Sequence, residues 1–305
     1  MKKFVVVPGK DFYYFSDIDD ADIYIEEEPF LSIKNKFLST TERLLKKINA
    51  WRLYSFFCKS WKEKLEECDS CVIFDQAFSP AIVRIIESFN PDIQINVYLW
   101  NPVFKDISIL KRLDSVKSKV NIFSFDRNDC KNYGFSFSPM IYNFNVKAVN
   151  YSEPKYDVVF VGYMKNRAKM LIDIYNKLQS ANASVFYYVL DNVNTVETTP
   201  FELHNDYLSY PEYKKCMFSS KAVLDIVQDG QVGLTIRTME TICYRKKLIT
   251  NNTDVINYEF YNPDNIFVIG KDDINDLNEF INRPFIDIPD EILIRYNFCD
   301  WVKSF

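Results

Sequence analysis

Residues 222–251 read AVLDIVQDGQVGLTIRTMETICYRKKLITN, and this stretch decides the fold. Its first six residues are mostly apolar and predict a buried strand. A polar loop containing Gly230 and Gly233 follows, and a helix is predicted from about Thr235. KLIT (247–250) predicts the next strand. A strand, a helix and a strand in this order are typical of a parallel α/β sheet.

The same alternation runs through both halves of the chain. Short apolar runs predict strands at 4–7, 22–27, 71–75, 95–100, 121–125, 157–162, 184–190, 222–227, 247–250 and 265–270. Helical spacing is found at 38–66, 80–89, 166–179, 235–245 and 273–282. A polar segment with Pro154 separates the two sets of strands. We therefore expect an α/β protein of two Rossmann-like domains, 1–150 and 151–305, that face each other across a ligand-binding cleft.

The composition excludes several classes of protein. The chain has 305 residues and a formal net charge of −5, which does not support nucleic-acid binding, and 48% hydrophobic residues exclude global disorder. No apolar run approaches the roughly 18 residues of a membrane-spanning helix, and we expect no signal peptide. The seven cysteines are scattered, and Cys68 with Cys71 lacks the further ligands of a zinc site. We therefore expect reduced thiols in a cytoplasmic protein.

The start of the predicted helix at 235–245 has residue types that suit a phosphate. Backbone N–H groups and the positive end of the helix dipole lie there, and Gly233 would let the main chain approach an anion closely. Arg237 can bind two diphosphate oxygens, and Glu240, one turn further on, can accept hydrogen bonds from a ribose diol. The alternative is an ordinary helix on which Arg237 forms a weak surface ion pair with Glu240 or Asp225.

The segment SSKAVLDIVQDGQVGLTIRTMETICYRKKLITNN resembles the carboxyl-terminal nucleotide-sugar site of GT-B glycosyltransferases. With INYEFYNPDNIFVIG after it, the likeness is to bacterial glycosyltransferases of lipopolysaccharide and capsule assembly, and it covers roughly residues 156–270. The resemblance implies that Glu240 binds the nucleotide ribose and that loop amides bind the diphosphate. These loop residues are Gln231, Gly233, Leu234 and Thr235. Val232 departs from the two-glutamate signature of many retaining members, which leaves the stereochemistry open.

A second strand-to-helix turn is predicted within DVVFVGYMKNRAKMLIDIY (157–175). Gly162 permits close approach there, and Lys165 and Arg167 can neutralise phosphate charge. The turn resembles the first turn of a GT-B carboxyl-terminal domain, which contacts donor and acceptor. A solvated basic helix start is the alternative.

The nucleotide base needs an aromatic or edge-reading surface. Tyr188, Tyr207 and Tyr210 are the candidates in the segments that follow. His204 is the only histidine of the chain, and we expect it in a solvent-facing loop, since no neighbouring residue tunes it.

In the first half, Asp75 follows a predicted central strand. A carboxylate at a strand end can act as general base toward a sugar hydroxyl, or it can simply cap the turn. Asp126 is a second candidate of this kind, and WNP (100–102) can line the acceptor side. Asp17 and Asp19 form the DxD pattern of metal-using transferases, but they follow only one predicted strand, so we expect no metal site there.

Residues 32–64 differ from the acidic average of the chain. Nine basic residues oppose Glu42 and Glu63, and aromatic residues alternate with them. A basic aromatic region is typical of a face that binds an anionic membrane, with Trp51, Phe57 and Trp61 as anchors if exposed. The alternative is a helix that packs on the core and has a solvated basic side.

The resemblance, taken with these patterns, implies a cytoplasmic, metal-independent hexosyltransferase that needs no cofactor. It would transfer a sugar from a UDP- or GDP-linked donor to a lipopolysaccharide O-antigen or capsule acceptor, glycan or lipid-linked, near the inner membrane face. Residues 151–305 would bind the donor and 1–150 the acceptor. Lys165 and Arg237 would stabilise the leaving diphosphate, and Asp75 would be the base if the reaction inverts. A nucleotide-sugar epimerase could share the fold, and a catalytically silent nucleotide-sugar or glycan-binding scaffold at the membrane is the alternative.

Overall fold

The computed structural model describes residues 2–7, 18–31, 35–48, 50–144, 153–191, 198–228 and 230–305, without the side chains of 46 and 47. The chain forms two compact units. Unit 1 comprises Met1–Asn143 together with Tyr296–Phe305, and unit 2 comprises Phe144–Arg295.

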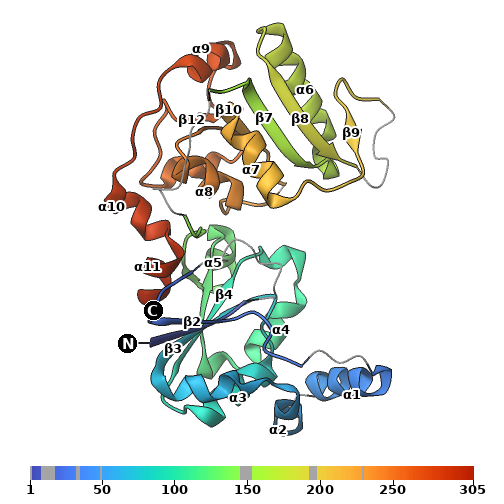
Figure 1. Cartoon of the computed structure of the whole chain (residues 1–305), viewed down its shortest axis with the longest axis vertical. Helices are drawn as coiled ribbons and strands as arrows, with labels where there is room; N and C mark the ends of the chain where they lie inside the picture. Colours follow the sequence, from blue (N-terminus) through green and yellow to red (C-terminus); the bar gives the residue numbers. More distant parts are fainter. Residues whose placement is uncertain are drawn as a thin grey trace. The chain divides into compact units, whose positions relative to one another are not determined.

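Unit 1 contains a six-stranded parallel sheet in the order β2-β1-β3-β4-β5-β6 (Figure 1). The strands are β1 (Lys2–Val6), β2 (Ile23–Glu26), β3 (Cys68–Phe74), β4 (Gln94–Leu99), β5 (Asn121–Ser124) and β6 (Ser136–Phe137). The helices are α1 (Lys36–Lys47), α2 (Trp51–Tyr54), α3 (Pro80–Phe89), α4 (Ser108–Asp114), α5 (Arg127–Tyr133) and α11 (Phe298–Lys303), with 3₁₀ turns η2 (Ser55–Phe57), η3 (Ser60–Glu67) and η4 (Val103–Lys105).

Unit 2 contains a second six-stranded parallel sheet, in the order β12-β11-β10-β7-β8-β9. The strands are β7 (Tyr156–Tyr163), β8 (Val185–Leu190), β9 (Leu203–His204), β10 (Ser220–Asp225), β11 (Lys247–Thr250) and β12 (Ile266–Val268). The helices are α6 (Ala168–Ser180), α7 (Tyr210–Phe218), α8 (Ile236–Cys243), α9 (Leu277–Asn282) and α10 (Asp290–Leu293), with 3₁₀ turns η7 (Lys165–Arg167), η8 (Thr253–Asn257), η9 (Ile274–Asp276) and η10 (Ile294–Tyr296).

The strand order of unit 2 is that of the dinucleotide-binding Rossmann fold. If β7 is counted as the first strand of this unit, β10 is the fourth, and these two strands are neighbours at the centre of the sheet. The chain adds strands on one side of β7 and then on the other, so the winding reverses between β7 and β10. Ligands of such sheets bind at the carboxyl ends of the strands beside this switch point. The fold therefore directs attention to the residues that follow β7 and β10.

The expected α/β class and all ten predicted strands are confirmed. Strands β6 and β9 were not predicted, since each has only two residues and therefore no periodicity. The helical stretch expected at 38–66 is not one continuous helix. Residues 36–67 form α1, α2 and the 3₁₀ turns η2 and η3, and the extended Cys58, which bridges to Phe30, separates η2 from η3.

The last ten residues belong to unit 1 and differ from the sequence-based division at residue 150. Trp301 of α11 donates a hydrogen bond from Nε1 to the hydroxyl of Ser138 over 2.7 Å and packs against Tyr98 at 4.8 Å between ring centroids. Tyr142 also donates its N–H to the Tyr296 carbonyl over 2.9 Å. The chain therefore returns to the first sheet after it has built the second.

All seven cysteines are free thiols. Cys68 and Cys71 of β3 are both buried in the same hydrophobic cluster, and burial raises the pKa of Cys68 to about 11. Within the described part of the chain, no group of three or more His, Cys, Asp or Glu side chains could hold a metal ion. The same residues contain no helix long and apolar enough to span a membrane.

Candidate functional site

The carboxyl ends of β7 and β10 bring together the two segments that the sequence singled out. Gly162 lies at the end of β7, and Lys165 and Arg167 follow it in η7. Asp225 ends β10, and α8 begins eleven residues later at Ile236. Gly162, Arg167 and Arg237 are in contact range of one another at the switch point of the sheet.

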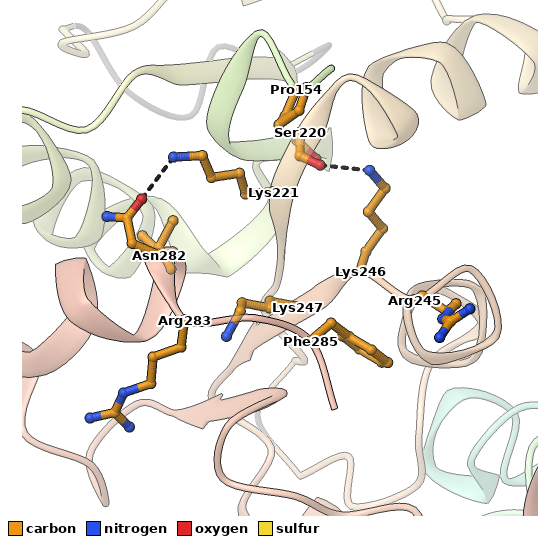
Figure 2. A pocket seen from close by; sticks show the side chains of 10 residues that line it. Pro154, Ser220, Lys221, Arg245, Lys246, Lys247, Asn282, Arg283 and Phe285 are labelled. Atoms are coloured by element: carbon orange, nitrogen blue, oxygen red, sulfur yellow. Dashed lines mark hydrogen bonds between the residues drawn. The ribbon is translucent and has the colours of Figure 1, made fainter. Parts of the chain in front are cut away.

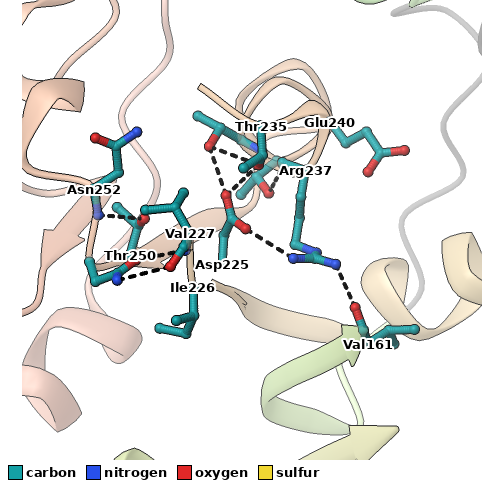
Figure 3. Close-up of polar contacts among 12 residues, drawn as sticks. Val161, Asp225, Ile226, Val227, Thr235, Arg237, Glu240, Thr250 and Asn252 are labelled. Carbon is teal, nitrogen blue, oxygen red and sulfur yellow. Dashed lines mark hydrogen bonds and ion pairs between the residues drawn. The ribbon is translucent and has the colours of Figure 1, made fainter. Parts of the chain in front are cut away.

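Asp225 organises the start of α8 (Figure 3). Its carboxylate is fully buried and accepts hydrogen bonds from the hydroxyls of Thr235 and Thr238, the latter over 3.0 Å. Arg237 forms an ion pair with the other carboxylate oxygen over 2.9 Å. Thr235 also caps the helix, since its Oγ1 accepts the N–H of Thr238 over 3.1 Å. The ion pair weighed as a surface contact is therefore a largely buried one.

Two guanidinium groups meet above Gly162. A Cβ on Gly162 would lie 3.2 Å from Nη2 of Arg237 and 3.3 Å from Nη2 of Arg167, so the absence of a side chain makes room for both. Both groups also lie over the ring of Phe160, at 5.3 Å for Arg167 and 5.5 Å for Arg237. Arg237 Nη2 donates to the carbonyl of Val161 over 2.5 Å.

The two arginines have different partners, since Arg237 pairs with Asp225 and Arg167 binds main-chain carbonyls. Arg167 donates to the main-chain carbonyls of Tyr163, over 2.8 and 3.0 Å, and of Ile226. Burial and the neighbouring Arg237 lower the pKa of Arg167 to about 10. Burial also opposes the charge of Arg237, but Asp225 and the other nearby acidic groups leave its pKa above the ordinary value. The Nε of Arg237 is buried and has no hydrogen-bond partner among the described residues. Asp225, through its ion pair, and Glu240, at longer range, offset the guanidinium charges of this cluster.

Glu240 is one turn further along α8 and is 1% exposed. Its two carboxylate oxygens accept hydrogen bonds from Tyr210 and Tyr213, each over 2.7 Å. Burial raises the pKa of Glu240 to about 7, although both hydroxyls and Arg237 oppose the rise. In Figure 3 the Glu240 carboxylate is turned away from Asp225. A ribose would have to share or replace these tyrosine contacts.

Tyr213 is the partner that the sequence reasoning missed. It belongs to α7, which Ser209 and Glu212 begin with a capping box. The Ser-x-x-Glu spacing could have placed Tyr210 and Tyr213 on one side of a helix, three positions apart.

The loop between β10 and α8 is tied to the end of β11. The Asn252 side-chain amide donates to the carbonyls of Val232 and Gly233 over 3.0 and 3.3 Å, and the Asn251 side chain exchanges hydrogen bonds with the main chain of Val227. Gln231 Nε2 donates to the carbonyl of Gly233 over 3.3 Å. Leu234 is buried, so only its main chain could reach a ligand.

The remaining aromatic candidates lie around β8 and β9. Tyr188 stacks on His204 with 3.8 Å between ring centroids, and its hydroxyl donates to the Asp206 carbonyl over 2.8 Å. Tyr207 is exposed and hydrogen-bonds Tyr163. Lys165 is exposed, adopts a left-handed φ of 47° and lies 5.6 Å from the ring centroid of Tyr163. Arg167 is thus the more deeply placed of the two basic residues in this turn.

In unit 1, Asp75 lines a pocket of about 360 Å³ at the carboxyl ends of β3 and β4. Its carboxylate accepts hydrogen bonds from the Gln76 N–H over 2.8 Å and from the N–H and side-chain amide of Asn101 over 3.0 and 3.1 Å. Burial raises the pKa of Asp75, and burial lowers the pKa of Lys105 on the same pocket, although Asp75 opposes that fall. The pocket thus contains a carboxylate and an amine whose charges are both disfavoured.

The other acidic residues that the sequence singled out and the structure describes do not line this pocket. Asp126 caps α5, since its carboxylate accepts the Asn128 N–H over 2.8 Å. Ser79, not Asp75, caps α3. Asp19 is exposed, and Asp17 is outside the described residues.

A second pocket, of about 310 Å³, lies at the amino ends of β10 and β11 (Figure 2). None of the ten described residues that line it is acidic, and five are basic: Lys221, Arg245, Lys246, Lys247 and Arg283. Lys246 donates from Nζ to the carbonyls of Phe218 and Ser220 over 2.9 and 2.8 Å. It thereby binds a carbonyl at the end of α7, where a cation also suits the helix dipole.

No protein-family model matches the chain, and no curated protein matches it. Solved structures similar to it include TarM, at 14% identity with a TM-score of 0.47, over 77% of this chain and 50% of that one. TarM of S. aureus with fondaparinux, α-GlcNAc-glycerol and UDP is 12% identical, with a TM-score of 0.44 over 80% and 54%. A structure of accessory secretory proteins 1, 2 and 3 of Streptococcus pneumoniae is 8% identical, with a TM-score of 0.44, over 84% of this chain and 54% of that one. The chain spans about half the length of these structures.

Proposed function

We propose that this protein is a GT-B glycosyltransferase that transfers a hexose from a UDP- or GDP-linked sugar to a bacterial surface glycan. The observation that carries the proposal is the pair of guanidinium groups beside Gly162, of which Arg237 pairs with Asp225, at the switch point of unit 2. Guanidinium groups bind diphosphate oxygens through charge-assisted hydrogen bonds. The resemblance of residues 156–270 to nucleotide-sugar sites supports the same assignment.

In this proposal the arginines act on the leaving group. The sugar–oxygen bond breaks as the acceptor hydroxyl attacks, and negative charge develops on the departing diphosphate. Preorganised donors aimed at that charge stabilise the transition state, with Arg167, Arg237 and Lys165 in this role. Gln231, Gly233 and Thr235 contribute through the loop and helix start. Because these groups bear the charge, we expect equal turnover with excess EDTA and with magnesium.

Unit 1 would bind the acceptor, a lipopolysaccharide O-antigen or capsule glycan that is free or lipid-linked. Asp75 supports this role, because it lies in a pocket at the strand ends and burial raises its pKa toward that of a useful base. If the reaction inverts, Asp75 would accept the hydroxyl proton. Asp75→Asn should then lower turnover by about 10²–10⁴-fold with unchanged donor binding. We further propose that the enzyme works in the cytoplasm, against an anionic membrane.

The catalytically silent scaffold is the second candidate. It is favoured by the three hydrogen bonds that already occupy the Asp75 carboxylate and by the two that occupy Glu240. Release of free sugar from a donor that binds would decide for an enzyme. Binding with neither hydrolysis nor transfer to any glycan would decide for the scaffold.

Calorimetric titration with UDP, GDP, CMP and their sugars tests the donor site directly. Arg167→Gln should weaken binding of the preferred diphosphate by about 10–100-fold, as expected for the loss of charge-assisted hydrogen bonds. Arg283→Gln, which removes a basic residue from the opposite end of the sheet, is the matched control and should bind normally. If both variants bind the diphosphate as the native protein does, the assignment of the switch-point cluster is wrong.

A further inference from the structure

Helix α1 presents an apolar stripe to solvent. Phe37, Leu44 and Ile48 recur at helical spacing and are 77%, 54% and 61% exposed. Leu45, at the edge of the stripe, packs against the core of unit 1. A helix of a folded domain normally buries such a stripe, so most of this one has no covering element among the described residues.

Two more exposed apolar side chains follow α1 in the chain. In α2 and η2, Leu53 is 56% exposed and Phe56 is 78% exposed. The prediction that Trp51, Phe57 and Trp61 anchor the protein in a membrane is wrong, because these side chains are not free to enter a bilayer. Trp61 is buried and donates its Nε1–H to the Pro29 carbonyl over 2.7 Å, while Trp51 and Phe57 pack against the core. Because residues 38–66 do not form one continuous helix, Leu53 and Phe56 face solvent in place of the expected anchors.

Basic residues surround the stripe. Residues 35–64 contain eight lysines and arginines but only Glu42 and Glu63 as acids, in a chain whose net charge is −5. Lys36, Arg43 and Arg52 are exposed. A helix with one apolar and one basic face is typical of segments that lie in the surface of a membrane.

We propose that the face formed by the exposed residues of α1, α2 and η2, here the α1–η2 face, docks unit 1 on an anionic bilayer. The apolar side chains would enter the boundary between headgroups and acyl chains, and the basic side chains would meet anionic headgroups. A second copy fits this face less well, because a symmetric contact would bring its basic residues together. The inference deepens the membrane part of the proposed function, but it depends on no donor-site residue.

Vesicle co-sedimentation of the full chain tests the docking surface. The native protein should bind phosphatidylcholine vesicles only when phosphatidylglycerol is included, and binding should fade from ~50 mM to ~500 mM salt as screening increases. A double variant, Phe37→Ser with Phe56→Ser, should lower the partition coefficient by about tenfold or more through lost insertion. Arg43→Glu with Arg52→Glu should abolish the dependence on phosphatidylglycerol. Both pairs are exposed, so the variants should keep the native melting temperature.

Ile294→Ser is the matched control, since Ile294 is an exposed apolar residue of unit 2, and it should bind vesicles normally. Equal binding of the native protein to neutral vesicles would overturn the proposal, as would unchanged binding of the Phe37/Phe56 variant. A native dimer that this variant converts to a monomer would also overturn it and identify a second copy as the occupant. Vesicle binding without nucleotide binding would leave the docking surface standing and refute the donor site.

Discussion

Basic side chains gather at both ends of the strands in the unit 2 sheet, but their partners differ. We call the side where the strands end the carboxyl edge and the side where they begin the amino edge. At the carboxyl edge, Arg167 and Arg237 converge on Gly162, and Arg237 pairs with Asp225. At the amino edge, Lys246 and Lys247 donate to main-chain carbonyls, Lys247 to Asp264 over 2.6 Å. The first arrangement places two guanidinium groups together at a strand end, whereas the second holds ammonium groups against separate main-chain carbonyls.

The outer basic residues of the amino edge are also paired. Arg283 forms ion pairs with Asp264 and Glu279, and Arg245 with Asp287, all on the exposed surface. Exposed ion pairs of this kind contribute little to the free energy of unfolding. The comparison teaches that a count of basic residues does not identify an anion site. What distinguishes the carboxyl edge is that two guanidinium groups converge on one glycine, at the place where the fold binds ligands.

The largest effect should come from the buried carboxylate of Asp225. Asp225→Asn leaves two guanidinium groups together without their counter-charge and weakens the bonds from Thr235 and Thr238. Breaking a buried pair costs about 3–5 kcal/mol of unfolding free energy. Urea denaturation measures it, and Asp287→Asn at the amino edge is the control, with an expected loss of about 0–1 kcal/mol. Equal losses for both variants would remove the contrast between the edges.

Glu240 should make stability fall as pH rises. Burial raises its folded pKa to about 7, so between about pH 4.5 and 8 the folded state binds more protons than the unfolded state. The unfolding free energy should drop by about 3 kcal/mol over that window. Glu240→Gln keeps the shape and one acceptor oxygen, and it should flatten this part of the curve. A variant that keeps the native slope would show that Glu240 does not titrate there.

Lys247 should give the opposite sign at higher pH. Burial lowers its folded pKa to about 8, so above that pH the unfolded state binds more protons and stability rises. For one such lysine the gain from about pH 8 to 10 is about 2 kcal/mol. Burial also lowers the pKa of Lys246 to about 8, so two lysines should give this gain. Lys247→Met should therefore remove about half of the rise, and Lys221→Met, at a partly exposed lysine of the same pocket, should leave it unchanged. The two edges would thus be separable by pH window alone, and a rise that keeps its full native size in Lys247→Met would refute the assignment.

Local patterns were sufficient to predict the sheets, because each of the ten predicted strands carries its own apolar run. The pieces that were missed depend on distant contacts. Strand β9 pairs with Val189 and Leu190 of β8, and the extended Cys58 between η2 and η3 bridges to Phe30. Neither contact is visible in a short window of sequence.

The candidate site shows the same limit. The pattern after β10 predicted that Arg237 and Glu240 lie in the first two turns of one helix, and α8 confirms this. The sequence does not show which residues are their partners. It suggests the pairing of Arg237 with Asp225 only as a surface contact, because the burial of this pair depends on how the whole sheet folds. The hydrogen bond from Tyr213 to Glu240 joins residues 27 apart on two helices.

The smallest effect separates two reasons for a glycine. Gly162→Ala puts a methyl group 3.2–3.3 Å from two guanidinium groups, and these are held by Val161, Ile226 and Asp225. Such crowding costs about 1 kcal/mol or somewhat more, and it should also weaken binding of the preferred nucleoside diphosphate by displacing the donors. Gly270, in contrast, has open space around it and a φ of +87°.

Gly270→Ala should therefore cost about 1 kcal/mol through backbone strain and leave nucleotide affinity unchanged. Thermal denaturation and calorimetric titration of both variants give the two readouts. Equal stability losses with a binding defect in Gly162→Ala alone would show that the close approach at the end of β7 serves the ligand. A binding defect in neither variant would mean that Gly162 only accommodates the arginine side chains, and the switch-point cluster would then be architectural like the amino edge.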